Sequence, residues 1–152
     1  MNSRRTVYTR LGLSGLLILA ILVSGGLALA HKEKHTPEQL QAFNEEFMEQ
    51  VRIGDLLWHG DKATQEQLGV NLSDTGAACA MCHPDTSDSH PQGYPKFQEQ
   101  MSEFATFRDM VNWCIEKPNQ GEKIDPDGAA MKAIEAYAYW ANRGSKLDPG
   151  RH

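Results

Sequence analysis

Apolar residues recur at helical spacing after residue 35. The residues that would share one helix face are Leu40, Phe43, Phe47 and Val51. Thr36 precedes them as an N-cap, with Pro37 at the first helical position and Gln39 completing a capping box. The pattern predicts a helix that begins at Thr36, and residues 54–58 (Gly-Asp-Leu-Leu-Trp) either continue it or follow a bend.

Two further helices are predicted in the second half of the chain. One begins at Thr106 and ends before Pro118, with an apolar stripe at Phe107, Met110, Val111 and Cys114. The last helix is expected from about Gly128 to Asn142, with Gly144 closing it. The residues on its apolar face are Met131, Ile134, Tyr137, Ala138 and Ala141.

The remaining segments favour loops. Residues 60–78 are polar and punctuated by glycine, and 84–95 are rich in Pro, Ser, Asp and Gly, while 97–101 fit one or two helical turns. No alternating strand pattern of any length occurs. The sequence therefore predicts an all-α domain in which the helices pack around something other than a large apolar core.

The first 30 residues differ from the rest. They contain three arginines and no acidic residue, and an uncharged apolar stretch follows from Leu11 to Ala30. A basic start, an apolar middle and the small-residue end Ala28-Leu29-Ala30 are typical of a secretory signal peptide cut after Ala30. The stretch is also about as long as a spanning helix, so a retained membrane anchor is the alternative. We expect an exported protein whose mature domain is 31–152.

Cleavage after Ala30 would leave a strongly acidic chain. The sequence has 15 Lys and Arg and 20 Asp and Glu, and three of the basic residues lie in the first 30. Twelve basic residues then remain against twenty acidic ones, a net charge of −8. Nucleic acid and anionic membrane surfaces reward clustered lysine and arginine. The charge argues against both as partners and favours a basic or neutral protein.

The chemistry of the chain centres on Cys79-Ala80-Met81-Cys82-His83. C-x-x-C-H is the attachment motif of a c-type haem. Two thiols form thioethers with the haem vinyl groups, and their spacing lets both reach one edge of the macrocycle from a single helical turn. His83 then binds the iron from the proximal side. We expect one covalent haem c, which would also fill the centre of the helical domain.

Two other interpretations of the motif fit the sequence less well. A redox dithiol does not need the histidine and normally follows a strand in a βαβ unit, which the pattern does not contain. A zinc site needs two more ligands, for which His59 and His90 are available but lack a motif of their own. Haem attachment gives Cys79 and Cys82 a role in an exported protein, and Cys114 remains as the third cysteine.

The chain around the motif resembles the class I c-type cytochromes. In that family a proline after the motif offers its carbonyl to the proximal histidine, and Pro95 has the matching spacing, with Pro91 as its competitor. The family also packs a glycine of its N-terminal helix against an aromatic residue of its last helix. Gly54 and Tyr137 resemble that pair. The resemblance implies a helical domain wrapped around one haem.

The sixth iron ligand would be a sulfur atom from the second half of the chain. The candidates are Met101, Met110, Cys114 and Met131. Met110 and Cys114 are four residues apart and share a helix face, which would equally suit an ordinary apolar core. A thiolate would lower the reduction potential and a thioether would raise it. Met110 and Cys114 are nearly equal candidates for the sixth ligand. Met131 is a weaker candidate because it lies inside the last predicted helix.

The segment Val111-Asn112-Trp113-Cys114 is similar to one in sulfur-oxidising c-type cytochromes, the thiosulfate dehydrogenases and the haem subunit of the Sox complex. In those proteins the cysteine binds the haem iron and takes part in thiosulfate chemistry. The resemblance spans roughly residues 54–142 and implies the same place for Cys114. Met110, however, stands where that family has its active-site arginine, so a neutral thioether replaces the cation that would hold an anionic sulfur substrate.

Residues 90–97, His-Pro-Gln-Gly-Tyr-Pro-Lys-Phe, also resemble a loop of small monohaem cytochromes, which implies periplasmic electron transfer. We therefore expect an electron carrier whose partners are other periplasmic or membrane-bound redox proteins. It would touch the membrane itself only if the N-terminal segment is retained. The alternative is a sulfur-chemistry haem enzyme, for which Arg108 and Lys117 are the basic residues nearest Cys114 in sequence. No feature supports a redox or gas sensor.

Overall fold

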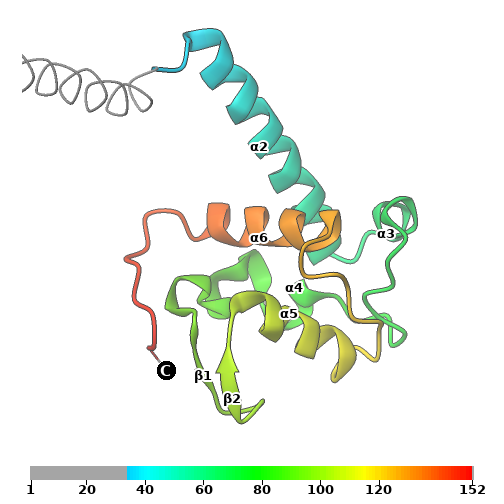
Figure 1. Ribbon diagram of the computed structural model, residues 1–152. Helices are drawn as coiled ribbons and strands as arrows, with labels where there is room; N and C mark the ends of the chain where they lie inside the picture. Colours follow the sequence, from blue (N-terminus) through cyan, green and yellow to red (C-terminus); the bar gives the residue numbers. More distant parts are fainter. Residues whose placement is uncertain (1–33, 152) are drawn as a thin grey trace, which may run out of the picture. The chain divides into compact units, whose positions relative to one another are not determined.

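The computed structural model describes residues 34–151, and this part of the chain is mainly helical (Figure 1). The predicted signal peptide, 1–30, lies outside the described residues. The helices are α2 (Pro37–Trp58), α3 (Lys62–Leu68), α4 (Cys79–Cys82), α5 (Phe107–Glu116) and α6 (Ala129–Ala141). Two short 3₁₀ helices, η1 (Pro84–Ser89) and η2 (Pro91–Gly93), and two strands, β1 (Lys96–Gln98) and β2 (Glu103–Ala105), lie between α4 and α5. Within 34–151, no helix has the length and apolar character needed to cross a membrane.

Helix α2 begins as predicted and runs unbroken to Trp58. The Thr36 backbone N–H donates to Gln39 Oε1 at 2.9 Å, and the Gln39 N–H donates to Thr36 Oγ1 at 3.2 Å, which is the expected capping box. The apolar stripe is buried only in its last part. Phe43 and Phe47 are 54% and 43% exposed, whereas Val51 is 4% exposed. Only the C-terminal part of α2 therefore contributes to the core.

Helices α2 and α6 touch at Gly54. A Cβ built on Gly54 would lie 2.6 Å from the carbonyl carbon of Ala133 and 2.7 Å from the Cβ of Tyr137, closer than real Cβ atoms come to other heavy atoms. Glycine is therefore required here because its missing side chain lets the two backbones approach. The expected pairing of Gly54 with Tyr137 is confirmed.

The core lies where the end of α2 meets α5 and α6. Helix α6 is its most buried element, since Met131, Ala133, Ile134 and Ala138 have no exposed surface. Helix α5 adds Phe107, Val111 and Ile115. The predicted bounds of both helices are confirmed to within a residue or two: Thr106 caps α5 through a capping box with Asp109, and Gly128 and Asn142 flank α6.

The prediction of loop for residues 60–78 is wrong in part, because α3 lies within it. The Asp61 carboxylate accepts the Thr64 N–H at 2.7 Å as an N-cap, and Gly69 ends the helix with a left-handed φ of 64°. Helix α3 (KATQEQL) has almost no apolar residue, so periodicity could not reveal it. Its two capping residues were the available signal.

The expectation of helical turns at 97–101, and of no strands, is also wrong. Residues 96–105 form an antiparallel hairpin in which Phe97 pairs with Phe104 and Gln98 with Glu103. Each strand is three residues long, too short for an alternating pattern to stand out. The hairpin matters because β1 forms part of the functional site.

Candidate functional site

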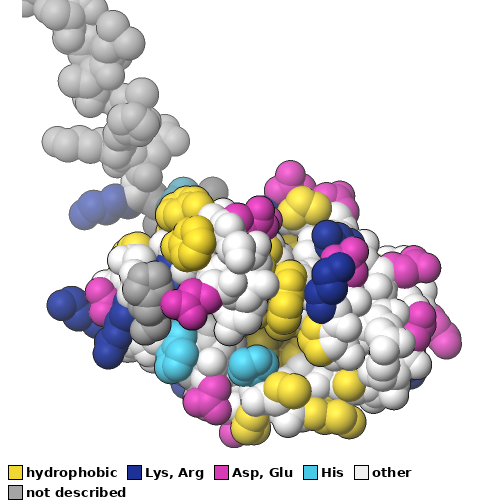
Figure 2. All heavy atoms as spheres, turned by 90° about the horizontal axis from the view of Figure 1, so that it is seen from below, with side chains coloured by type: hydrophobic (Ala, Val, Ile, Leu, Met, Phe, Trp, Pro, Cys, Tyr) yellow, Lys and Arg dark blue, Asp and Glu magenta, His cyan; other side chains and the backbone are white. Residues whose placement is uncertain are grey.

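A cavity of about 520 Å³ is lined by residues from the end of α2, α4, η1, β1 and α5 and from the loops next to them. Figure 2 shows a hollow lined by apolar side chains on the face seen from below, with histidine side chains beside it. The cavity volume falls within the range of about 300–1,000 Å³ that is usual for ligand and cofactor sites. All three residues expected to attach the haem, Cys79, Cys82 and His83, line this cavity.

The attachment motif forms a single helical turn, as its spacing predicts. Helix α4 consists of Cys79–Cys82 alone, and the His83 backbone N–H closes the turn by donating to the Cys79 carbonyl at 2.9 Å. Burial raises the pKa of the Cys79 thiol to about 11, with nearby Cys114 adding to the effect. Both motif cysteines are free thiols. One turn therefore presents two thiols and an imidazole to the same cavity.

His83 is held by its backbone and has an unsatisfied ring nitrogen. Its carbonyl accepts the Trp58 indole N–H at 2.9 Å, and the two rings lie 6.4 Å apart between centroids. The Nδ1 atom is buried, and no hydrogen-bond partner for it exists among the described residues. Buried polar atoms are almost always paired, so Nδ1 still lacks the acceptor that would orient the ring, and the other ring nitrogen, Nε2, is the candidate ligand for a metal that the cavity would hold.

Pro95 and Pro91, the two expected carbonyl partners of His83, do not line the cavity. Pro95 is exposed, and its carbonyl accepts the Gly150 N–H at 3.1 Å. Pro91 is buried, and its carbonyl accepts the Tyr94 N–H at 3.3 Å. No hydrogen bond joins either carbonyl to the described His83 ring. The role of Pro95 stays a prediction.

Two of the candidate sixth ligands reach the cavity. Met110 and Cys114 of α5 line it and are half-buried. Met131 is fully buried in the core, and Met101 lies at the turn of the hairpin. Neither Met131 nor Met101 lines the cavity. Burial raises the pKa of the Cys114 thiol to about 11, and Cys82 adds to the shift. The structure thus brings the C-x-x-C-H turn and two sulfur side chains of α5 to one cavity.

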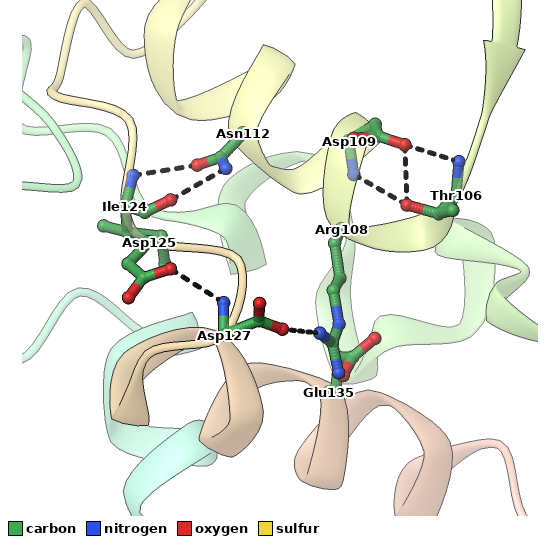
Figure 3. A network of polar contacts seen from close by, with 8 residues as sticks. All are labelled: Thr106, Arg108, Asp109, Asn112, Ile124, Asp125, Asp127 and Glu135. Carbon is green, nitrogen blue, oxygen red and sulfur yellow. Dashed lines mark hydrogen bonds and ion pairs between the residues drawn. The ribbon is translucent and has the colours of Figure 1, made fainter.

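Asn112, which stands between these two sulfur residues, anchors a loop (Figure 3). Its side-chain amide donates to the Ile124 carbonyl at 2.9 Å, and its side-chain oxygen accepts the Ile124 N–H at 2.9 Å. The Asn112 side chain therefore satisfies both backbone hydrogen-bonding groups of Ile124, which lies in the loop 117–128. Asn112 therefore fixes that loop to α5, next to Trp113 and Cys114, rather than pointing at a ligand.

The two basic residues expected near Cys114 form ion pairs outside the cavity. Arg108 contacts Asp127 and Glu135, each at 2.8 Å, which ties α5 to α6 and its preceding loop (Figure 3). Lys117 pairs with Glu116 at 3.1 Å. Neither lines the cavity. The cation that does line it is Lys96 of β1, which the sequence analysis passed over because the hairpin was not predicted.

The two histidines considered for a zinc site lie in different places. His59 binds Asp55, with its Nδ1 atom 2.9 Å from the carboxylate, and does not line the cavity, although His90 does. Among residues 34–151, no group of three or more His, Cys, Asp or Glu side chains is arranged to hold a metal ion. An iron with a single protein imidazole, held by its macrocycle, does not require such a group.

Residues 69–147 match the family model described as the SoxA/TsdA cytochrome c domain, which is more than half of the chain. The chain belongs to this family. A cytochrome c domain implies covalently bound haem c with iron and a haem-based role in electron transfer. The match includes the C-x-x-C-H turn, the hairpin, α5 and α6. No curated protein matches the chain.

The residues present fit this cofactor. The cavity offers the two thiols needed for the thioethers, an imidazole with an unpaired nitrogen, and the apolar walls that a flat macrocycle requires. Phe107 and Val111 of α5 and Trp58 of α2 supply apolar wall and are each less than 10% exposed. The described cavity and the family match therefore agree on the kind of group that is held.

Proposed function

We propose that this protein is a periplasmic electron-transfer protein that carries single electrons on one covalently attached haem c. The observation behind the proposal is that α4 and α5 bring Cys79, Cys82, His83 and two sulfur side chains to one apolar cavity. Bound haem supplies reversible one-electron chemistry between ferric and ferrous iron. A carrier needs little more from its protein than attachment, two axial ligands and the exclusion of water.

Each residue of the cavity has a role in this proposal. Cys79 and Cys82 form the thioethers, and His83 is the proximal ligand. Trp58 holds the His83 carbonyl and so fixes the turn from which the imidazole projects. Pro95 would have to give up its present partner, or use the second lone pair of its carbonyl, to accept from His83.

The sixth ligand is Met110 or Cys114. Met110 is neutral and can bind iron without loss of a proton, which would give a high potential. Burial raises the pKa of the Cys114 thiol to about 11, so this thiol loses its proton less readily than a free one. Metal binding would have to displace that proton, and a thiolate ligand would then lower the potential. The two ligands therefore predict opposite shifts of the potential.

The carrier function is favoured over sulfur catalysis by the residue at position 110 and by the partners of Arg108. The neutral Met110 occupies the place where the resembling enzymes carry an arginine, and Arg108, two residues earlier, is held by two carboxylates outside the cavity. A thiosulfate-oxidising enzyme should reduce its haem with turnover when thiosulfate and an artificial electron acceptor are supplied. Sustained turnover would contradict a function limited to electron transfer.

The location and partners follow from charge and export. We propose that residues 1–30 are a signal peptide and that 31–152 form the mature cytochrome domain. Its net charge of −8 favours basic or neutral redox partners, in the periplasm or bound to a membrane. The mass of the haem-containing protein, purified after export, tests the first point, since an uncleaved N-terminus would refute it.

Spectroscopy of the purified ferric and ferrous protein tests the whole proposal. A reversible titration with a single one-electron step is expected, and absence of covalent haem or of that step would refute it. A weak ferric charge-transfer band at long wavelength is expected for Met110 ligation. That band would eliminate Cys114 as the ferric ligand.

Two variants separate the ligands. If Cys114 binds the iron, C114S should lose the low-spin spectrum while M110L keeps it; if Met110 binds, the pattern reverses. M131L is a matched control for the loss of a sulfur atom, because Met131 is in the core and does not line the cavity. Low-spin spectra in both α5 variants would refute ligation from α5.

A further inference from the structure

The β1 strand turns its polar residues toward the cavity and its aromatic residue away from it. Lys96 and Gln98 line the cavity and are half-buried and buried, whereas Phe97 between them is 50% exposed. Successive side chains of a strand point to opposite faces, so this is the reverse of the usual burial pattern. The cross-strand partner of Phe97, Phe104, is 71% exposed. The inward-facing polar groups therefore need an explanation.

Lys96 is a cation at an apolar cavity without a counter-ion from the chain. It is the single lysine or arginine among the lining residues described, and no carboxylate in 34–151 lies within ion-pair distance of its ammonium. The ammonium lies 5.0 Å from the centroid of the Tyr94 ring. The carboxylate that lines the cavity is that of Asp88, on an exposed residue of η1. Three N–H donors of Lys96 are thus available to a ligand.

Neighbouring amides and a hydroxyl are hydrogen-bonded to one another on the side of the cavity where Lys96 lies. The Tyr94 hydroxyl donates to Gln98 Oε1 at 3.2 Å, and the Gln98 side-chain N–H donates to Gln100 Oε1. Gln98 is only 7% exposed, and its amide has a second N–H left to donate. A cation, a spare amide N–H and Gln100 therefore gather on one side of an otherwise largely apolar cavity.

We propose that Lys96, with Gln98 beside it, binds an oxyanion in this cavity. The ligand is a carboxylate of the cofactor, a haem propionate, or a small free oxyanion of the same chemistry such as sulfate. The inference rests on the proposed haem-binding function. A cation paired with an oxyanion is stabilised in a site of low polarity, and its positive charge also stabilises the reduced, less positive iron.

The test compares K96M and K96R with wild-type holoprotein in anion-poor buffer. K96M keeps the aliphatic stem and removes the charge, and K132M removes a charge from an exposed lysine of α6 that does not line the cavity. We expect K96M to lower the equilibrium constant for haem reduction by about threefold to tenfold, or about 30–60 mV at about 59 mV per tenfold change. K96R should restore the wild-type value, and K132M should change it less than K96M does.

A second arm identifies the source of the oxyanion. Wild-type and K96M ferric proteins are titrated with sulfate while the haem absorption is followed. A lower potential in K96M without added anion supports the propionate. An unchanged anion-free potential together with at least tenfold weaker sulfate binding in K96M supports a free oxyanion.

Equal potentials and equal anion binding in wild type and K96M would overturn the inference. That result leaves the proposed function intact, because the wild-type redox step is measured in the same experiment. If the wild-type protein itself has no reversible one-electron step, the proposed function fails instead.

Discussion

Replacement of Gly54 by alanine adds one methyl group at the contact between α2 and α6. The new Cβ would lie 2.6 Å from the Ala133 carbonyl carbon and 2.7 Å from the Tyr137 Cβ. Backbone atoms cannot rotate away as the end of a flexible side chain can. The two helices must therefore separate, and the buried side chains around the contact must repack.

The expected cost is a balance of two opposing effects. Alanine in a helix interior is favoured over glycine by about 1 kcal/mol. Overpacking of a well-packed core costs about 1–3 kcal/mol and occasionally more, and contact with backbone on the facing helix places G54A at the upper end. The net destabilisation should be about 2 kcal/mol, which lowers the melting temperature by roughly 4–8 °C in a protein of this size.

Thermal and urea unfolding of the holoprotein, followed by circular dichroism, measure the effect. G93A is a matched control, because its Cβ would meet its nearest neighbour, the Arg151 carbonyl oxygen, at an ordinary 3.6 Å. The haem spectrum should stay unchanged in G54A, since Gly54 does not line the cavity. A G54A protein as stable as wild type, or more stable, would refute the close helix contact.

Three further outcomes are expected. W58F removes the indole N–H that donates to the His83 carbonyl and should lower the free energy of unfolding by about 1 kcal/mol in a urea titration; an unchanged value would show that this hydrogen bond is dispensable. N112A removes both bonds to Ile124, so exchange of the Ile124 amide proton should become about tenfold to a hundredfold faster, and unaltered exchange would contradict the anchoring of the loop. Burial raises the pKa of Tyr137 from 10.0 to about 12, with Asp55 adding to the shift, so the folded protein keeps this proton longer than the unfolded chain. The free energy of unfolding should therefore fall as the pH rises from 10 toward 12, and it should fall less steeply in Y137F than in wild type. Equal dependence of the unfolding free energy on pH in the two proteins would contradict the raised pKa of Tyr137.

The elements with a strong apolar stripe and a recognisable cap were predictable. Helix α5 has both, in Phe107 with Val111 and in the capping box from Thr106 to Asp109. Helix α3 has caps but no stripe, and it was missed. The three-residue strands have neither a stripe nor a cap. They form because they pair with each other, and that pairing leaves no periodic pattern in so short a segment.

The site was predictable where its spacing is local. Cys79, Cys82 and His83 belong to one turn, so their joint orientation toward the cavity follows from helical geometry alone. The place of Lys96 does not follow from local spacing. Its side chain reaches the cavity because the hairpin turns β1 toward α4 and α5, and no periodicity of the sequence encodes that turn.

By itself the sequence determined the attachment motif and limited the sixth ligand to four candidate sulfur side chains, while its resemblance to class I cytochromes pointed to the glycine at the α2–α6 contact. The physical reason is that the motif depends on the geometry of one helical turn, and that residue type alone limits which side chains can offer sulfur to an iron. The tertiary structure decided which candidates share a cavity. It placed Met110 and Cys114 beside the motif, buried Met131 in the core and held Arg108 between two carboxylates. These outcomes depend on contacts between segments far apart in the chain, which only the packed fold brings together.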